Sequence, residues 1–311
     1  MLKEQKSFFP HPFGYGRLYV VATPIGNLHD ISDRMRTILG EVALIAAEDT
    51  RHTQKLLNHL GLSTPLVSFH MHSPASVRSQ LIERLKAGDD VALVSDAGTP
   101  AISDPGLSLI EACIEEMITV TSVPGPNAAL TALVSSGLPT DHFLFIGFLP
   151  RTARKKEDML KMLRSLPFTL ILYEAPHRLQ ETLEAIVHIF GDRQAVLARE
   201  LTKVHEHVLR GSLSELLTYV QDNDIRGELT LLIAPSSTLE ESMHSIEKSV
   251  HHTYPIDHLD HLVEEVKGLK ALGVRVKEAV RVVGRLSGTD PKVLYQAYHA
   301  QMSENEEDQP L

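Results

Sequence analysis

An alternation of short apolar runs and longer amphipathic segments, between residues 18 and 123, constrains the fold more than any other feature. Short runs rich in β-formers that alternate with helices of about a dozen residues are typical of βα units around a largely parallel sheet. The expected strands are residues 18–22, 42–46, 66–69, 91–94 and 118–122, and the expected helices are 31–39, 53–60, 74–87 and 107–116. Residues 17–137 are therefore predicted to form an αβα domain.

A second alternation follows, and it predicts a second αβα domain at residues 138–236 after a hinge rich in glycine and proline near residues 137–140. The expected strands are residues 143–147, 169–173, 195–199, 203–210 and 229–234, and the expected helices are 155–166, 178–190 and 212–221. The strand at 203–210 follows its predecessor so closely that we expect the two to pair antiparallel, which makes the second sheet mixed.

The composition changes after residue 236. Residues 237–253 are polar and are predicted to be a linker to a small helical module at residues 254–302. Its expected helices are residues 257–268, 274–286 and 290–301, the last beginning at Asp290-Pro291, a favourable helix start. Residues 1–16 form an N-terminal extension to which we assign no role, and the acidic residues 303–311 are predicted to be a disordered tail.

Composition excludes several classes of protein. The single cysteine, Cys113, lies in an apolar helical stretch and is predicted to be a core residue, which leaves no disulfide framework and no cysteine-rich zinc site. The use of a single cysteine makes a reducing cytoplasm the expected compartment. No apolar stretch is long enough to span a membrane, and the N-terminus lacks a signal-peptide pattern. A net charge of −10 argues against a basic coat for nucleic acid, so any RNA contact must come from local basic patches.

Three loops rich in small residues and proline each follow an expected strand directly, at residues 23–28, 95–100 and 124–128. In open α/β sheets, ligands bind beyond the carboxyl ends of the strands. Small residues let a ligand approach the backbone, and proline fixes the turn. We therefore expect the three loops to converge on one ligand site. Neither G-x-G-x-x-G after a strand nor a P-loop motif occurs, which disfavours ordinary dinucleotide binding and phosphoryl transfer.

A group of acidic and basic residues lies where another expected strand ends and a helix begins, at residues 46–53. Glu48, Asp49 and His52 are candidates to remove a proton from a hydroxyl group. Arg51 is a candidate to hold a phosphate. The alternative is structural, because Asp49 or Thr50 also suits the cap of the following helix.

Further charged residues predict a surface that contacts RNA. Residues 173–178 and 198–203 carry dense charges at the ends of expected strands, and residues 151–164 and 267–292 are locally basic. Positive charge concentrated in so few segments of an acidic protein favours phosphate contact over an ordinary solvated helix face. The candidates are Arg154, Lys155, Lys156, His177, Arg178, Lys203, Arg275, Lys277, Arg281 and Arg285.

Two histidine pairs, His70 with His72 and His205 with His207, invite a metal-binding interpretation. On a strand, residues two apart share a face. A site needs a third ligand, however, and no His-Glu-x-x-His motif or cysteine pair supplies one. We therefore predict no metal site.

Six of these motifs, taken together and in order, resemble one family. They are residues 23–28, 47–51, 95–100, 124–126, 173–178 and 198–203, and they are similar to the small-subunit ribosomal RNA methyltransferase I branch of the tetrapyrrole methylase superfamily. The resemblance extends from about residue 16 to residue 234, with a looser match through the helical module. Residues 95–97, Ser-Asp-Ala, stand where the tetrapyrrole enzymes usually have Gly-Asp-Pro, a departure that fits the RNA branch.

The resemblance implies two αβα domains with S-adenosylmethionine in the cleft between them, and a homodimer. Much of the cofactor recognition is expected through backbone groups. The residues it implies for cofactor binding are Pro24, Asp96, Ala97, Gly98, Thr99, Pro124, Gly125, Asn127 and Ala128 in the first domain, and Tyr173, Ala198, Leu229 and Thr230 in the second.

The activity that the resemblance implies is methylation of the ribose 2′-hydroxyl of a cytidine in 16S ribosomal RNA of the 30S subunit. Such a reaction needs alignment and removal of a proton, but no metal and no covalent intermediate. Two alternatives stay open. One is a methyltransferase for a small tetrapyrrole, against which the basic segments and the helical module count. The other is a non-catalytic RNA-binding assembly factor, against which the intact cofactor loops count.

Overall fold

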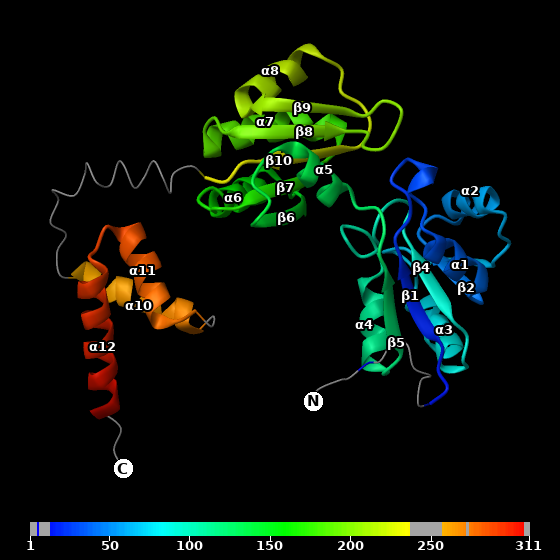
Figure 1. The fold of residues 1–311 in the computed structure, drawn as a ribbon, viewed down its shortest axis with the longest axis horizontal. Helices are drawn as coiled ribbons and strands as arrows, with labels where there is room; N and C mark the ends of the chain where they lie inside the picture. The colour runs from blue at the N-terminus through cyan, green and yellow to red at the C-terminus, as the bar shows by residue number, and fades with distance from the viewer. Residues whose placement is uncertain (1–4, 6–12, 237–256, 272–273, 308–311) are drawn as a thin grey trace. The chain divides into compact units, whose positions relative to one another are not determined.

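The computed structural model describes residue 5 and residues 13–236, 257–271 and 274–307 (Figure 1). The chain divides into two compact units, Met1–Ser236 and Ser237–Leu311. The predicted linker at 237–253, most of the N-terminal extension and the last four residues lie outside the described residues. Among the helices that the structure describes, none has the length and apolar character needed to cross a membrane.

The first half of unit 1 is an αβα layer structure, as predicted (Figure 1). Its five strands are all parallel, in the order β3-β2-β4-β1-β5. Helices α1 and α2 pack on one face of this sheet, and α3 and α4 pack on the other. The strands are β1 (Arg17–Val21), β2 (Leu44–Ala47), β3 (Leu66–Ser68), β4 (Val91–Val94) and β5 (Thr119–Val123), and the helices are α1 (Asp33–Glu41), α2 (Thr50–Leu60), α3 (Ala75–Lys86) and α4 (Leu107–Glu115).

The second half contains the predicted mixed sheet, in the order β6-β7-β10-β8-β9. Strands β6 and β7 are parallel, and the other three pairs are antiparallel. Helices α6, α7 and α8 cover one face and α5 covers the other. The bounds are β6 (Phe143–Phe148), β7 (Thr169–Glu174), β8 (Gln194–Arg199), β9 (His207–Ser212), β10 (Leu229–Ile233), α5 (Ala128–Ser136), α6 (Ala153–Leu163), α7 (Pro176–Phe190) and α8 (Leu213–Asp222).

Helix α5 was not predicted, because its small apolar residues show no clear amphipathic period. The Asn127 side chain caps it by accepting a hydrogen bond from the Leu130 N–H at 3.1 Å, and Gly137 ends it in the left-handed region. Its buried residues Ala129, Ala132 and Leu133 pack against β7, β8 and β10. By packing, the helix therefore belongs with the second sheet, although it precedes the boundary predicted at residue 137.

The strand predicted at 203–210 lies further along the chain, because β9 runs from His207 to Ser212. A tight turn takes its place, in which Glu200 and Thr202 adopt positive φ angles of 52° and 68°. Neither residue is a glycine, so the sequence carries no signal for this turn. The antiparallel pairing of β9 with β8 is confirmed.

Unit 2 is a bundle of three helices, α10 (Asp257–Ala271), α11 (Val276–Ser287) and α12 (Pro291–Glu307). The Asp290 side chain accepts a hydrogen bond from the Lys292 N–H at 2.8 Å, which confirms the predicted helix start. Helix α12 continues to Glu307, so residues 303–307 are helical instead of disordered. The core of the bundle consists of Leu262, Val263, Val266, Ala279, Val280, Val283, Leu294 and Tyr298.

Candidate functional site

The three loops predicted to converge do so at one edge of the first sheet. Strands β4, β1 and β5 are neighbours, so the loops that follow them leave the sheet side by side. The Thr23 N–H donates to the Gly98 carbonyl at 2.8 Å, and the Gly98 N–H donates back to the Thr23 carbonyl at 3.0 Å. The Thr99 hydroxyl donates to the Pro126 carbonyl at 3.3 Å. These contacts join all three loops into one surface.

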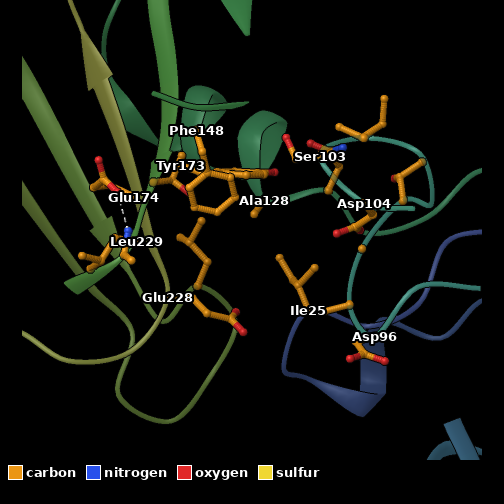
Figure 2. Close-up of a pocket in the computed structure, with 18 of the residues that line it drawn as sticks. Ile25, Asp96, Ser103, Asp104, Ala128, Phe148, Tyr173, Glu174, Glu228 and Leu229 are labelled. Atoms are coloured by element: carbon orange, nitrogen blue, oxygen red, sulfur yellow. Dashed lines mark hydrogen bonds between the residues drawn. The ribbon is translucent and has the colours of Figure 1, made fainter. Parts of the chain in front are cut away.

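A cavity of about 430 Å³, called here the acidic cavity, lies between this surface and the facing edge of the second sheet (Figure 2). The predicted cofactor residues that line it are Asp96, Ala97, Gly98, Thr99, Asn127, Ala128, Tyr173, Leu229 and Thr230. The Tyr173 hydroxyl accepts a hydrogen bond from the Ala129 N–H at 3.2 Å, so this ring is fixed against the start of α5. The acidic cavity is thus built by both halves of unit 1.

Four predicted cofactor residues do not line the acidic cavity: Pro24, Pro124, Gly125 and Ala198. Pro24 borders a smaller hollow of about 140 Å³. A Cβ on Gly125 would lie 3.0 Å from that of Ala22, so this glycine serves close packing of two loops. Ala198 is buried in β8, beside Thr230. These small residues allow close packing behind the cavity wall. In a sequence, a small residue needed for packing looks the same as one needed for contact with a ligand.

The acidic cavity takes its name from its lining, which contains carboxylates and no Lys, Arg or His among the described residues. The acidic residues are Glu48, Asp96, Asp104, Glu174 and Glu228. Glu174 pairs with Arg178 and Glu228 with Lys203, so the carboxylates without an ion-pair partner among the described residues are the other three. A wall of one charge sign concentrates ligands of the opposite sign. Apolar side chains such as Ile25, Phe148 and Tyr173 supply the remaining surface. This chemistry fits a positively charged ligand with an apolar ring, as the expected sulfonium cofactor is.

Hydrogen bonds from backbone N–H groups connect two of these acids with Asp49, at the ends of β2 and β4. The Asp49 N–H donates to Asp96 at 3.0 Å, and the Asp96 N–H donates to Glu48 at 3.3 Å. Burial raises the pKa of Glu48. Burial, with the negative charge of Glu48, raises the pKa of Asp104 to about 6. Carboxyls with raised pKa values are stronger proton acceptors than ordinary ones.

The predicted acid–base set separates in the structure. Glu48 borders the acidic cavity, whereas His52 faces the 140 Å³ hollow. Asp49 caps α2 by accepting from the Arg51 N–H at 2.8 Å, and its carboxylate forms an ion pair with the Arg51 side chain at 2.7 Å. Hydrogen bonding to Arg51 lowers the pKa of Asp49, which makes it a weak base. The capping alternative therefore describes Asp49 better than the catalytic one.

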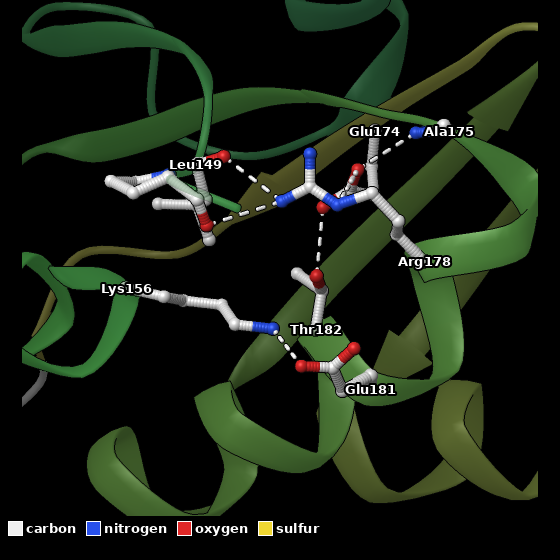
Figure 3. A network of polar contacts seen from close by, with 8 residues as sticks. Leu149, Lys156, Glu174, Ala175, Arg178, Glu181 and Thr182 are labelled. Carbon is white, nitrogen blue, oxygen red and sulfur yellow. Dashed lines mark hydrogen bonds and ion pairs between the residues drawn. The ribbon is translucent and has the colours of Figure 1, made fainter. Parts of the chain in front are cut away.

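Two residues predicted to hold phosphates, Arg178 and Lys156, lie instead in a buried polar network (Figure 3). The Arg178 guanidinium donates to the Leu149 carbonyl at 2.9 Å and lies 3.5 Å from the Glu174 carboxylate. The Lys156 ammonium contacts Glu181 at 2.7 Å, and its side chain is only 4% exposed. Both cations are paired with carboxylates of the protein, an arrangement that favours a structural role over the predicted contact with RNA.

Lys203 is also engaged, through ion pairs with Glu200 at 2.9 Å and Glu228 at 3.2 Å. Its stem covers Gly26, where an added Cβ would lie 2.3 Å from the Lys203 Cγ. Lys203 thus joins a loop of the first half to the second half. The other predicted RNA contacts are exposed: Arg51, Arg154, Lys155, His177, Arg275, Lys277, Arg281 and Arg285.

Sequence reasoning missed three parts of the cavity wall: Phe148, residues 227–228, and residues 102–104, a stretch that follows the second loop. Its backbone is unusual, because Ala101 and Ser103 adopt positive φ angles of 67° and 61°. The run Ser103-Asp104-Pro105-Gly106 is polar and rich in turn formers, a signal that the second loop continues beyond Pro100.

Comparison with known proteins agrees with this architecture. The family model described as Tetrapyrrole (Corrin/Porphyrin) Methylases matches residues 17–217. The ribosomal RNA small subunit methyltransferase I of Halalkalibacterium halodurans is 44% identical over 284 residues, which cover 91% of this chain and 95% of that protein.

Two solved structures share the fold at low sequence identity. A cobalamin biosynthetic enzyme, cobalt precorrin-4 methyltransferase, matches with a TM-score of 0.55 and 16% identity, over 73% of this chain and 98% of its own. The uroporphyrin-III C-methyl transferase of Thermus thermophilus, complexed with S-adenyl homocysteine, matches with a TM-score of 0.51 and 17% identity, over 70% of this chain and 97% of its own.

Proposed function

This chain belongs to the tetrapyrrole methylase family, and within it to the ribosomal RNA small subunit methyltransferases I; from that premise we propose that it methylates the ribose 2′-hydroxyl of a cytidine in 16S ribosomal RNA. It is a methyltransferase that uses S-adenosylmethionine. The observation that carries the proposal is the acidic cavity, where the loops after β1, β4 and β5 meet the second sheet.

The residues of the acidic cavity fit this cofactor, which supplies a methyl group already activated by a positively charged sulfur. Asp96 offsets positive charge. The backbone at Ala97 and Gly98 is accessible because the side chains are small or absent. Phe148 and Tyr173, whose ring centroids are 5.8 Å apart, offer an aromatic surface to a base. The cavity walls would thereby hold the ligand in one orientation and exclude water.

Removal of the hydroxyl proton needs an acceptor beside the cavity. Glu48 is the one member of the predicted acid–base set that lines it, and Asp104 is a second carboxyl in the same wall. Burial raises the pKa of both. Ionised carboxylates at these positions would accept a proton more readily than exposed ones.

The proposed substrate implies a cellular location for the enzyme. An enzyme that modifies 16S RNA of the 30S subunit works in the cytoplasm, and we include that location and a homodimer in the proposal. Helix α5 offers an apolar surface for self-association, since the side chains of Leu130 and Val134 are 48% and 78% exposed. No step of the reaction requires a metal.

Labelled S-adenosylmethionine incubated with unmodified 30S subunits, naked 16S RNA or a porphyrinogen tests the function directly. We expect label on the RNA, in a ribose that resists alkaline cleavage at the modified position. Label on the porphyrinogen would support the small-molecule alternative. Cofactor binding without transfer to any of the three would support a non-catalytic assembly factor.

The helical module is proposed to dock RNA. Arg275, Lys277, Arg281 and Arg285 are exposed, and no ion pair engages them within the described part of the chain. Replacing all four with Gln should weaken 30S binding and reduce its dependence on log salt by about 0.7 for each phosphate that the protein no longer neutralises. Affinity for S-adenosylmethionine should not change. Filter binding over a salt series and calorimetry measure the two effects.

The control for this variant removes four positive charges that are already paired on the surface of unit 1. The residues to replace with Gln are Arg84, Lys86, Lys161 and Arg226. An equal loss of 30S binding in both variants would mean that net charge, and not the helical module, is responsible. Unchanged binding in the module variant would leave dimer stabilisation as the role of these helices.

A further inference from the structure

A second concavity of about 400 Å³, called here the side hollow, lies next to the acidic cavity. It is formed by the turn after β3, the first part of α3, and the segment at residues 104–108 that leads into α4. Of the described residues that line either concavity, Asp104 alone is shared by both. Asp104 therefore lies in the wall between them.

The two concavities differ in charge. The acidic cavity contains no basic side chain among the described residues, whereas the side hollow contains Arg78 and His70. Arg78 is half-buried and has no ion-pair partner among the described residues. The side hollow also offers apolar surface from Phe69 and Met71. A phosphate would be repelled by the acidic cavity, but it fits the side hollow, where a guanidinium is available.

The backbone on both sides of Asp104 adopts unusual conformations. Ala101, Ser103 and Gly106 all have positive φ angles, of 67°, 61° and 134°. The segment contacts β6 closely, because an added Cβ on Gly147 would lie 2.7 Å from the Ser103 hydroxyl. Figure 2 shows Ser103 and Asp104 on the same side of the acidic cavity, across from Tyr173. Strained non-glycine residues persist where the surrounding structure imposes them, and they cluster at functional sites.

We propose that the side hollow receives the target nucleotide, with a phosphate at Arg78, and that Asp104 accepts the proton of the ribose 2′-hydroxyl. The ribose oxygen forms a bond to the methyl carbon while the carbon–sulfur bond breaks, its electron pair stays on sulfur, and the hydroxyl proton passes to the Asp104 carboxylate. This inference rests on the proposed function and assigns the place of its substrate.

The electrostatic surroundings support this role for Asp104. Burial and the charges of Glu48 and Asp96 raise its pKa to about 6, against a lowering by a hydrogen bond with Ser95. The carboxyl is therefore mostly ionised at neutral pH, yet it is a stronger base than an exposed aspartate. Tyr173 lines the same cavity, where the negative charge of Asp104 acts on its hydroxyl, and Arg78 and His70 line the side hollow.

Arg78→Gln tests the phosphate contact. We expect the KM for 30S subunits to rise about tenfold, the size of one charge-assisted hydrogen bond, with kcat and the Kd for S-adenosylmethionine unchanged. Filter binding of 30S subunits should show the same weakening without any turnover. Arg84→Gln is the matched control, because it removes a positive charge from the same helix outside the side hollow, where Arg84 pairs with Asp89.

Asp104→Asn tests the proton acceptor. We expect kcat to fall about 100-fold or more, as for a missing general base, while calorimetry shows a nearly unchanged Kd for S-adenosylmethionine. Wild-type kcat should rise with pH along a limb at or below pH 6, since a bound cation lowers the pKa of a nearby carboxyl. The limb should disappear in Asp104→Asn, and Asp104→Glu should restore part of the rate.

The possible outcomes distinguish failure of the substrate-site proposal from failure of the proposed function. Wild-type kinetics and wild-type 30S binding in Arg78→Gln would overturn the assignment of the side hollow. A raised cofactor Kd in Asp104→Asn, with kcat unchanged at saturation, would make Asp104 a cofactor contact and overturn its role as proton acceptor. A wild-type enzyme that methylates no ribose would overturn the proposed function, whereas the filter-binding comparison would still decide whether the side hollow docks RNA.

Discussion

Gly98→Val should weaken S-adenosylmethionine binding about 100-fold or more, close to loss at concentrations that saturate the wild type. Gly98 lines the acidic cavity and has a φ of 79°, a conformation that a β-branched residue rarely adopts. An added Cβ would already lie 3.4 Å from the Ile25 side chain, and the two methyl groups of valine extend further. The variant thus combines backbone strain of about 1–3 kcal/mol with loss of the space that the ligand needs.

Gly61→Val provides the control for strain. Gly61 has a φ of 70° at the end of α2, and nothing lies within 4 Å of an added Cβ. We expect both variants to lose stability, but only Gly98→Val to lose cofactor affinity. Calorimetry on the folded proteins, with thermal melts beside it, measures the two effects. Unchanged affinity in Gly98→Val would remove the second loop from the cofactor site.

The sequence predicted the architecture of unit 1 well because its signals are local and periodic. Each loop at residues 23–28, 95–100 and 124–128 follows an apolar strand, and parallel topology brings such loops to one edge. The cap at Asp49 was likewise readable, since a capping side chain bonds to its own helix. Features that depend on neighbouring residues, such as helix caps, or on a periodic pattern, such as strands and helices, can be predicted from the sequence.

Tertiary context decided the remaining features. Lys156 belongs to a basic run, but its side chain packs between α6 and α7 and meets Glu181, a partner distant in sequence. Asp104 carries no motif of its own, and its position depends on contacts between its segment and β6. Long side chains can cover apolar surface while their charged ends find partners, so a count of positive charges does not predict which cations remain available to RNA.

For Arg178, the sequence-based prediction and the structure differ most. From the sequence we expected Arg178 to bind a phosphate, whereas in the structure it lies beside the buried Glu174 carboxylate and stabilises the fold. The Glu174 side chain is only 1% exposed, and its carboxylate also accepts hydrogen bonds from the Thr182 hydroxyl at 2.7 Å and the Ala175 N–H at 2.8 Å. Without Arg178, Glu174 would keep a buried negative charge with no cation beside it, and the Leu149 carbonyl would lose its donor.

Arg178→Ala should therefore lower the free energy of unfolding by about 3–5 kcal/mol, the usual range when one partner of a buried pair is removed. For a unit of this size, the melting temperature should fall by about 6–20 °C. His177→Ala, one residue earlier and exposed, is the matched control and should melt like the wild type. Denaturant titration and calorimetry measure both. If Arg178→Ala melted like the wild type but bound 30S subunits weakly, the result would instead support the predicted phosphate contact. A cation that belongs to the buried network cannot be removed without loss of stability.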